Sequence, residues 1–228
     1  CIAMHPYYET GWSRNLVYPH IGFDEMHFID YFDQTKILRE YITDQELYDK
    51  IIKRYENRKN NEKLFFMGIT MQNHGGYTET YDNFPENYYK VGRSYTDANQ
   101  YLSLVHESDE AVKNLISYFS KVDDPVEIIF FGDHQPSLNS NFYPILNGKG
   151  LTGLTEDELE KLYTVPFFIW TNYDTPEETV DITSLDYLST MALERAGIEL
   201  PAYNKFLADM QEVVPAINSR AVSYTHLR

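Results

Sequence analysis

The sequence predicts an α/β fold in which a largely parallel sheet is sandwiched between helices. Apolar runs at residues 64–71, 128–131 and 165–172 have the length of buried strands, which are shorter than typical helices. Segments with apolar residues at helical spacing lie between these runs. Strands that alternate with helices along a chain are typical of a parallel sheet with helices on both faces.

The first part of the chain is expected to contain two short strands and two helices. Residues 1–6 have the pattern of a strand end that enters a loop, and residues 25–29 fit a second short strand. Ser13 is placed to cap a short helix. A longer helix is predicted after Thr43, because Glu46 stands three positions later as in a capping box.

The middle of the chain is expected to run from a strand through loops into a long helix. The strand at residues 64–71 is followed by a polar loop that contains two glycines. Residues 78–92, rich in Tyr, Asn and Pro, are expected to form a surface loop. Thr96 or Asp97 is predicted to cap a helix that continues to Phe119 and covers one face of the sheet.

The last part is predicted to add two strands, an acidic helical turn and a helix. The strands are residues 128–131 and 165–172, with the acidic turn at residues 155–159 between them. A helix that opens at Ser184 is expected to stop at Gly197.

A chain of 228 residues is long enough for one sizeable domain, and no internal repeat or linker divides it. We therefore expect one domain over residues 1–215. Residues 216–228 end in a stretch that fits neither helical nor strand spacing, and are predicted to form a tail that need not be native.

The composition excludes several classes of protein. With 43% hydrophobic and 15% aromatic residues, the chain is not expected to be disordered. A net charge of −16 argues against nucleic-acid binding, because phosphate backbones require a surplus of Lys and Arg. No run approaches the roughly 18 apolar residues of a membrane span, so this segment is expected to be soluble. The single cysteine, Cys1, leaves the compartment undecided.

The strand at residues 128–131 is predicted to deliver a carboxylate and an imidazole to the edge of the sheet. Gly132 ends the strand, and Asp133 and His134 follow it directly. Ligands bind beyond the carboxyl ends of the strands in open α/β sheets. A carboxylate oxygen beside an imidazole nitrogen suits manganese, zinc or magnesium. The alternative interpretation is that the pair only caps a loop.

Four motifs, taken together and in this order, resemble the sulfatase-like branch of the alkaline phosphatase superfamily. They are His5, the Trp12-Ser13-Arg14 triplet, the Asn73-His74-Gly75-Gly76 loop and the Gly132-Asp133-His134 strand end. The likeness is greatest to lipoteichoic acid synthase and related phosphoglycerol transferases, and it covers about residues 1 to 200. The resemblance implies that the domain over residues 1–215 is the later part of such a catalytic domain, truncated at its N-terminus.

The resemblance assigns Asp133 and His134 to one catalytic divalent ion. Mn²⁺ or Mg²⁺ is implied, while Zn²⁺ and Ca²⁺ stay open. The family's threonine nucleophile and its other metal ligands precede the matched region. The chain alone is therefore expected to be inactive, since two ligands hold a metal weakly and covalent transfer needs a nucleophile.

The resemblance assigns the other motifs to the substrate pocket. His74 would be the catalytic residue, binding substrate and handling protons at the reacting oxygen. His5 and Trp12 would also bind substrate, with Trp12 beside the glycerol, and the planar guanidinium of Arg14 would grip two phosphate oxygens. The alternative interpretations are a satisfied loop histidine, a core tryptophan and an arginine paired with Asp or Glu at the surface.

The implied function is metal-dependent transfer of a phosphoglycerol-type group from an anionic phospholipid or ester to a glycolipid or polymer of the cell envelope. The full-length protein would act at the extracellular face of a bacterial cell membrane, held by an N-terminal anchor that this chain lacks. Two alternatives stay open, namely hydrolysis of a sulfate or phosphate ester by the same fold, and a non-catalytic module that binds glycans or lipid headgroups.

Overall fold

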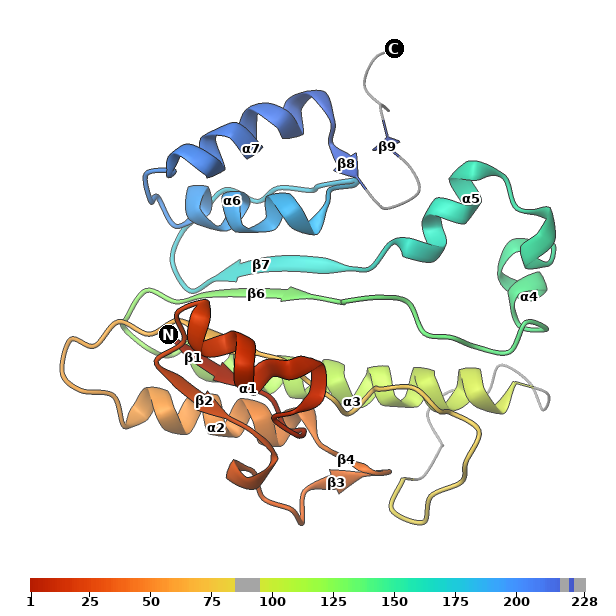
Figure 1. Ribbon diagram of the computed structural model, residues 1–228, viewed down its shortest axis with the longest axis horizontal. Helices are drawn as coiled ribbons and strands as arrows, with labels where there is room; N and C mark the ends of the chain where they lie inside the picture. The colour runs from red at the N-terminus through yellow and green to blue at the C-terminus, as the bar shows by residue number, and fades with distance from the viewer. Residues whose placement is uncertain (85–94, 218–221, 224–228) are drawn as a thin grey trace. The chain divides into compact units, whose positions relative to one another are not determined.

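The structure is a computed structural model that describes residues 1–84, 95–217 and 222–223. Its chain divides into two compact units, and Figure 1 labels most of their helices and strands. Unit 1 comprises Cys1–Lys121 and Pro136–Leu151, and unit 2 comprises Val122–Gln135 and Thr152–Arg228. The expectation of one domain over residues 1–215 stays a prediction. The loop expected at residues 78–92 and the tail at 216–228 lie partly outside the described residues.

Unit 1 contains a parallel three-stranded sheet, which confirms the predicted class. The strands are β1 (Ile2–Met4), β2 (Glu25–His27) and β5 (Phe66–Gly68), in the order β2-β1-β5. Both neighbours run parallel to β1. All three residues of β1 are buried, as expected for a central strand between two others. The carboxyl ends of β1 and β5 therefore meet at the same edge of this sheet.

Helix α2 (Asp44–Glu56) begins after Thr43 as predicted, but only one of the two hydrogen bonds of the predicted capping box is present. The Thr43 hydroxyl accepts a hydrogen bond from the backbone N–H of Glu46 at 3.2 Å, as a capping box requires. The Glu46 carboxylate does not return to Thr43, however, but accepts from the backbone N–H of Asp33 at 2.9 Å. The cap thus ties the preceding loop to the first turn of the helix, and α2 packs against β5.

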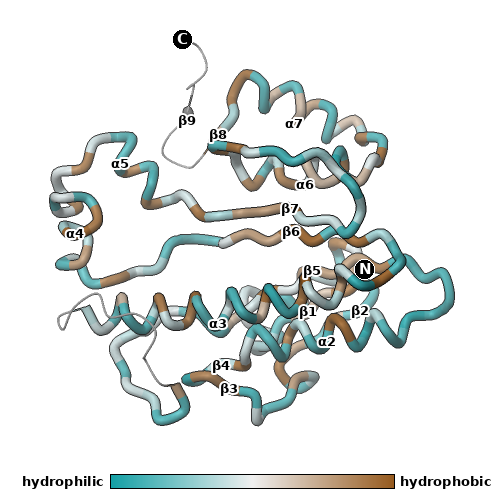
Figure 2. The backbone as a smooth tube through the Cα atoms, turned by 180° about the vertical axis from the view of Figure 1, so that it is seen from behind, coloured by the Kyte–Doolittle hydropathy of each residue, from teal (hydrophilic) through white to brown (hydrophobic). Residues whose placement is uncertain are grey.

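Helix α3 (Thr96–Phe119) confirms the predicted long helix. Its N-cap is Tyr95, and neither Thr96 nor Asp97 has the predicted capping role. Figure 2 shows hydrophobic and hydrophilic residues alternating along it. Its buried residues recur at helical spacing, and the helix packs on α2.

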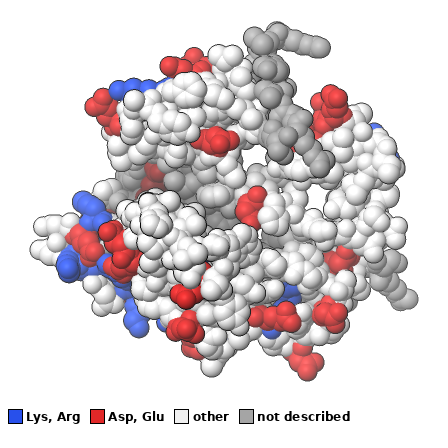
Figure 3. Space-filling model, viewed as in Figure 1, with Lys and Arg blue, Asp and Glu red and all other residues white. Residues whose placement is uncertain are grey.

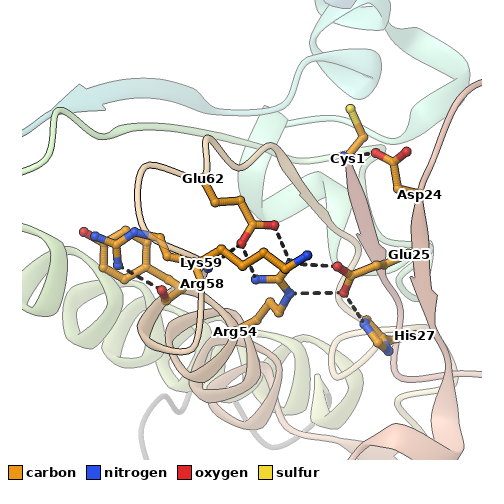
Figure 4. A network of polar contacts seen from close by, with 9 residues as sticks. Cys1, Asp24, Glu25, His27, Arg54, Arg58, Lys59 and Glu62 are labelled. Atoms are coloured by element: carbon orange, nitrogen blue, oxygen red, sulfur yellow. Dashed lines mark hydrogen bonds and ion pairs between the residues drawn. The ribbon is translucent and has the colours of Figure 1, made fainter.

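Ion pairs join strand β2 to helix α2 (Figure 4). Arg54 donates to both oxygens of Glu25, at 2.7 and 3.1 Å, and also to Glu62 at 2.8 Å. The hydrogen bonds from Arg54 lower the pKa of Glu25 to about 2. The Glu25 carboxylate is therefore charged at neutral pH.

Unit 1 also contains an antiparallel hairpin that the sequence pattern does not predict. It consists of β3 (Ile37–Leu38) and β4 (Tyr41–Ile42), with Leu38 opposite Tyr41. The short helices of unit 1 are α1 (Arg14–Val17) and α4 (Tyr143–Asn147), and single 3-10 turns lie at Gly11–Ser13, Tyr18–His20 and Ile29–Tyr31. Ser13 precedes α1 but its side chain makes no capping hydrogen bond, and its backbone is left-handed, whereas a capping residue typically has an extended backbone.

Unit 2 pairs β6 (Glu127–Phe131) with β7 (Phe167–Thr171) in antiparallel orientation, so these strands differ from the parallel pairing expected. Both strands are half-buried rather than buried. The segment between them leaves and returns at one end of the pair, where the Gly132 N–H donates to the Pro166 carbonyl. A connection that returns to the same end gives antiparallel neighbours.

Helices complete unit 2. α5 (Glu156–Glu160) has the full capping box of Thr155 and Glu158. α6 (Leu185–Arg195) packs against α7 (Ala202–Val213), and α7 is a helix that we did not predict from the sequence. The remaining elements are the 3-10 turns Leu151–Gly153 and Lys161–Tyr163 and the short pair β8 (Ala216–Ile217) and β9 (Val222–Ser223).

The described helices show no segment long and apolar enough to span a bilayer. Acidic side chains are spread over the face drawn in Figure 3, in keeping with the net charge of −16.

Candidate functional site

His5 directly follows β1 and is a neutral imidazole with one free acceptor. Its side chain is 1% exposed, and its Nδ1 lies 2.9 Å from the carbonyl oxygen of Ile69. Because a carbonyl only accepts, Nδ1 carries the proton and Nε2 is the acceptor. Nε2 is buried without a hydrogen-bond partner in the described structure. Burial, with a smaller effect of the Arg14 charge, lowers the pKa of His5 to about 4.

Trp12 is held at the surface by a strained turn. Trp12 and Ser13 have φ values of 53° and 54°, a left-handed conformation that costs side chains other than glycine about 1 kcal/mol or more each. The Trp12 side chain is 65% exposed, and its ring meets the ring of His5 edge-on at 6.3 Å. Trp12 is therefore not part of the core that the described residues form.

Arg14 lies against the face of Trp12. Its guanidinium carbon is 4.4 Å from the ring centroid, within the range of a cation–π contact. Nε donates to the hydroxyl of Tyr18 at 2.9 Å, and Nη1 donates to the Gly11 carbonyl at 3.2 Å. Within the described residues no carboxylate pairs with this guanidinium, so the surface ion-pair interpretation has no support there.

His74 lies in the loop after β5 with an exposed ring. Its Nδ1 is 3.3 Å from the hydroxyl of Tyr41, and the two rings meet edge-on at 5.7 Å. Its backbone N–H donates to the Met71 carbonyl at 3.0 Å. The ring is therefore oriented by β4 but open to solvent on its other side.

Aromatic rings connect these residues at the carboxyl end of β1 and β5. Tyr7 lies 6.0 Å from His5 and 6.2 Å from Tyr41, and Tyr41 contacts His74. The structure thus brings four predicted residues of unit 1 into one chain of contacting side chains, with the Trp12 to Arg14 segment at one end and His74 at the other.

A buried polar cluster, which we did not predict, supports the His74 loop. Asp44 accepts from the hydroxyl of Ser108 at 2.5 Å, and its backbone N–H donates to the Gln72 side chain at 3.1 Å. Asn73 also donates to Ser108, at 2.9 Å. Burial raises the pKa of Asp44 to about 6. The cluster fixes the start of the loop to both α2 and α3.

Asp133 and His134 lie in unit 2, directly after β6, with exposed side chains. The His134 Nε2 is 3.5 Å from the Asp133 carboxylate. His134 Nδ1 lies 2.9 Å from the Gln135 carbonyl, which leaves Nε2 as the unprotonated nitrogen of the neutral ring. A glycine at position 132 has a steric basis, because a Cβ there would lie 3.0 Å from the Cβ of Val165.

The Asp133 and His134 donors suit a divalent ion chemically, because an imidazole lone pair and a carboxylate oxygen lie side by side. In the part of the chain that the structure describes, no group of three or more His, Cys, Asp or Glu side chains could hold a metal. The pair also makes local contacts of the loop-capping kind, since Asp133 accepts from the His134 backbone at 2.9 Å. Metal binding by this pair therefore stays a prediction.

Comparison with known proteins identifies the family. The family profile described as Sulfatase matches residues 2–198. A protein of Rhizobium meliloti (strain 1021), provisionally named for cyclic beta-1,2-glucan modification, is 27% identical over 218 residues, which cover 92% of this chain and 34% of that protein. Lipoteichoic acid synthase of Staphylococcus saprophyticus is 29% identical over 138 residues, which cover 58% of this chain and 20% of the synthase. The chain thus spans about a third or less of these curated relatives.

A solved structure shares the fold. The Streptococcus pyogenes phosphoglycerol transferase GacH, in complex with sn-glycerol-1-phosphate, aligns with a TM-score of 0.75 at 21% identity, covering 96% of this chain and 56% of GacH. The profile covers most of the chain, and its relatives include lipoteichoic acid synthase. The protein therefore belongs to the Sulfatase family, and it is similar to lipoteichoic acid synthase over part of its length.

Proposed function

We propose that the protein is a metal-dependent transferase that moves a phosphoglycerol-type group from an anionic phospholipid or related ester to a glycolipid or polymer acceptor. One observation carries the proposal: Arg14, without a carboxylate partner among the described residues, and the free Nε2 of neutral His5 flank the same exposed Trp12. A guanidinium suits a phosphate, and a free imidazole nitrogen suits a hydroxyl donor. A glycerol phosphate carries both groups.

Each of these side chains has a separate task in the proposal. The fork of Arg14 binds two phosphoryl oxygens, while its contact with Trp12 fixes its plane. His5 accepts a hydrogen bond from a glycerol hydroxyl, a task for which its low pKa keeps it neutral. Trp12 covers the carbon backbone of the glycerol with its apolar face.

His74 is the proposed catalytic residue. Imidazole exchanges protons near neutral pH, and the exposed ring can hold a proton at the reacting oxygen or pass one to it. A divalent ion with Asp133 and His134 among its ligands, when bound, would supply positive charge for the phosphoryl oxygens. Mn²⁺ and Mg²⁺ are the ions that we propose, because phosphoryl oxygens and carboxylates are hard ligands.

The names of the relatives support an acceptor of the cell envelope. One is named for cyclic beta-1,2-glucan modification, another is a lipoteichoic acid synthase, and GacH is a phosphoglycerol transferase. We propose accordingly that the full-length protein works at the extracellular face of a bacterial membrane.

Turnover of phosphatidylglycerol tests this function directly. The protein that carries this chain, with its natural flanking sequence, is incubated with phosphatidylglycerol and Mn²⁺, and the diacylglycerol left after phosphoglycerol transfer is measured. Arg14→Lys should lower kcat/KM about tenfold or more, because the forked contact with phosphate is lost. The control Arg54→Lys replaces another arginine of unit 1, which donates to Glu25 and Glu62 and contacts none of the proposed substrate-binding residues, and it should leave turnover within about twofold.

Other outcomes would replace the proposal. Faster turnover of a sulfate or phosphate monoester than of phosphatidylglycerol would favour hydrolysis by the same fold. Binding of sn-glycerol-1-phosphate with no turnover of any ester would favour a non-catalytic module.

A further inference from the structure

Arg39 is a buried cation at a backbone position that arginine rarely occupies. It lies in the two-residue turn between β3 and β4, with a φ of 56° and a side chain that is 5% exposed. Such turns favour glycine or asparagine where φ is positive. Backbone strain of this kind persists where surrounding contacts over-determine it. The contacts of the Arg39 guanidinium therefore explain why this strained conformation persists.

The guanidinium binds the loop that carries His74. Nη2 donates to the carbonyls of Gln72 and His74, at 2.9 and 2.7 Å, and Nη1 donates to the carbonyl of Gly76 at 2.8 Å. A fourth bond goes from Nη1 to the side chain of Gln100 at 3.1 Å. Three alternate carbonyls of one loop thus converge on a single planar group, which a lysine ammonium cannot reproduce.

The same hairpin also contacts the ring of His74. The hydroxyl of Tyr41, two residues after Arg39, lies 3.3 Å from the Nδ1 of His74. The Arg39 guanidinium in turn lies 5.7 Å from the ring of Tyr41. The backbone and the ring of His74 are therefore held by two residues of one hairpin, Arg39 in its turn and Tyr41 in β4.

We propose that Arg39 is the positioning residue of His74. Arg39 fixes the backbone of His74, and Tyr41 fixes its imidazole ring. Arg39 sets the path of the loop through its three carbonyls, and Tyr41 donates its hydroxyl proton to Nδ1, so that the neutral His74 carries its proton on Nε2. The inference rests on the proposed function only in naming His74 as the catalytic group. It extends that function, because neither Arg39 nor Tyr41 belongs to the motifs that identify the family.

Nuclear magnetic resonance of the 228-residue chain tests the inference without turnover. In Arg39→Lys, the His74 amide should exchange with solvent at least about tenfold faster, because hydrogen bonds to a charged donor contribute more than one factor of ten each. The ring ¹⁵N signals of His74 should also move toward those of a histidine whose Nδ1 has no hydrogen-bond partner, because the contact with Tyr41 is loosened. In Tyr41→Phe, the ring signals should move while the amide exchange stays within about twofold, since the bonds of Arg39 remain.

Arg54→Lys is the matched control. Arg54 is also a well-bonded arginine of unit 1, but its partners are Glu25 and Glu62 (Figure 4). This variant should leave the His74 amide and ring signals unchanged, whatever it does to stability.

The two variants make the inference falsifiable even if one fails to fold. A folded Arg39→Lys protein with wild-type His74 exchange and ring signals would overturn it. If Arg39→Lys does not fold, the decision rests on Tyr41→Phe, where changed ring signals support the inference and unchanged ones overturn it. Absence of phosphatidylglycerol turnover by the wild-type protein would contradict only the proposed function. The His74 amide exchange and ring signals do not depend on turnover, so they test the positioning role separately.

Discussion

At the scale of single residues, His5 and Asp44 are two buried titratable groups with opposite effects on stability. The folded chain keeps His5 unprotonated down to about pH 4 and keeps Asp44 protonated up to about pH 6. Both shifts arise from the loss of water around the charged form. Neither residue type reveals its burial in the sequence, so these shifts are visible only in the folded structure.

Stability linked to His5 should be lost at acidic pH. Between its unfolded pKa of 6.5 and its folded pKa of about 4, the unfolded chain binds a proton that the folded chain does not. The contribution is therefore complete above pH 6.5 and declines by up to about 3 kcal/mol as the pH falls to 4. His5→Asn keeps a donor for the Ile69 carbonyl and should abolish this decline. Urea unfolding from pH 4 to 7 measures it, and an equal decline in both proteins would contradict the assignment.

Stability linked to Asp44 should change in the other direction. Its pKa is raised from 3.8 to about 6 on folding, so the folded chain binds the extra proton. Its contribution is complete below pH 3.8 and is lost as the pH rises through 6, by up to about 3 kcal/mol. Asp44→Asn should remove this loss, so its stability relative to the wild type should rise between pH 4 and pH 7. A difference that is constant over this range would refute the raised pKa.

The residues proposed to bind substrate could be predicted from the sequence, whereas the residue that holds the His74 loop in place could not. Trp12, Arg14 and His74 stand in recognisable motifs, and the structure connects them through His5. Arg39 carries no such signal, because nothing in its neighbours marks a left-handed turn whose guanidinium binds a loop more than thirty residues further along the chain. Long-range contacts of this kind follow from the fold and not from local spacing.

At the scale of elements, the strongly periodic segments were predictable and the short ones were not. α2, α3 and α6 follow their apolar spacing. The hairpin of β3 and β4 has only two residues in each strand, too few for alternation to show. α7 did have a signal in the sequence, because Pro201 precedes apolar residues at helical spacing.

The turn after β6 should depend on the absence of a side chain at Gly132. An added Cβ would lie 3.0 Å from the Cβ of Val165 and 3.3 Å from its Cγ1, so Val165 must move by a few tenths of an ångström. Gly132→Ala should destabilise the chain by about 1–3 kcal/mol, as overpacking does. Gly150→Ala is the matched control, because nothing lies within 4 Å of its added Cβ.

Urea unfolding of three proteins distinguishes the clash from a general effect of alanine. The double variant Gly132→Ala, Val165→Ala should recover part of the loss, since the contact atoms are removed. Equal stability of Gly132→Ala and Gly150→Ala would show that the close approach of Val165 does not constrain this turn.

At the scale of the whole molecule, a net charge of −16 makes weak binding of cations unavoidable. Specific binding of Mn²⁺ by Asp133 and His134 must therefore be separated from binding by other carboxylates. At about 0.15 M salt, paramagnetic broadening should begin at the signals of these two residues, and His134→Ala should lower the apparent affinity at least about tenfold. Broadening that is uniform over the acidic surface and unaffected by this variant would contradict the proposed metal ligands.

The central claim is that His5, Trp12 and Arg14 together bind a glycerol phosphate. The chain contains two tryptophans, exposed Trp12 and Trp170 of β7, so a titration with sn-glycerol-1-phosphate followed by indole N–H signals has a control within one molecule. The account predicts a saturable shift of Trp12 and His5 with Trp170 unchanged, and an affinity about tenfold lower in Arg14→Lys. No shift of Trp12, or equal shifts of both tryptophans, would contradict it.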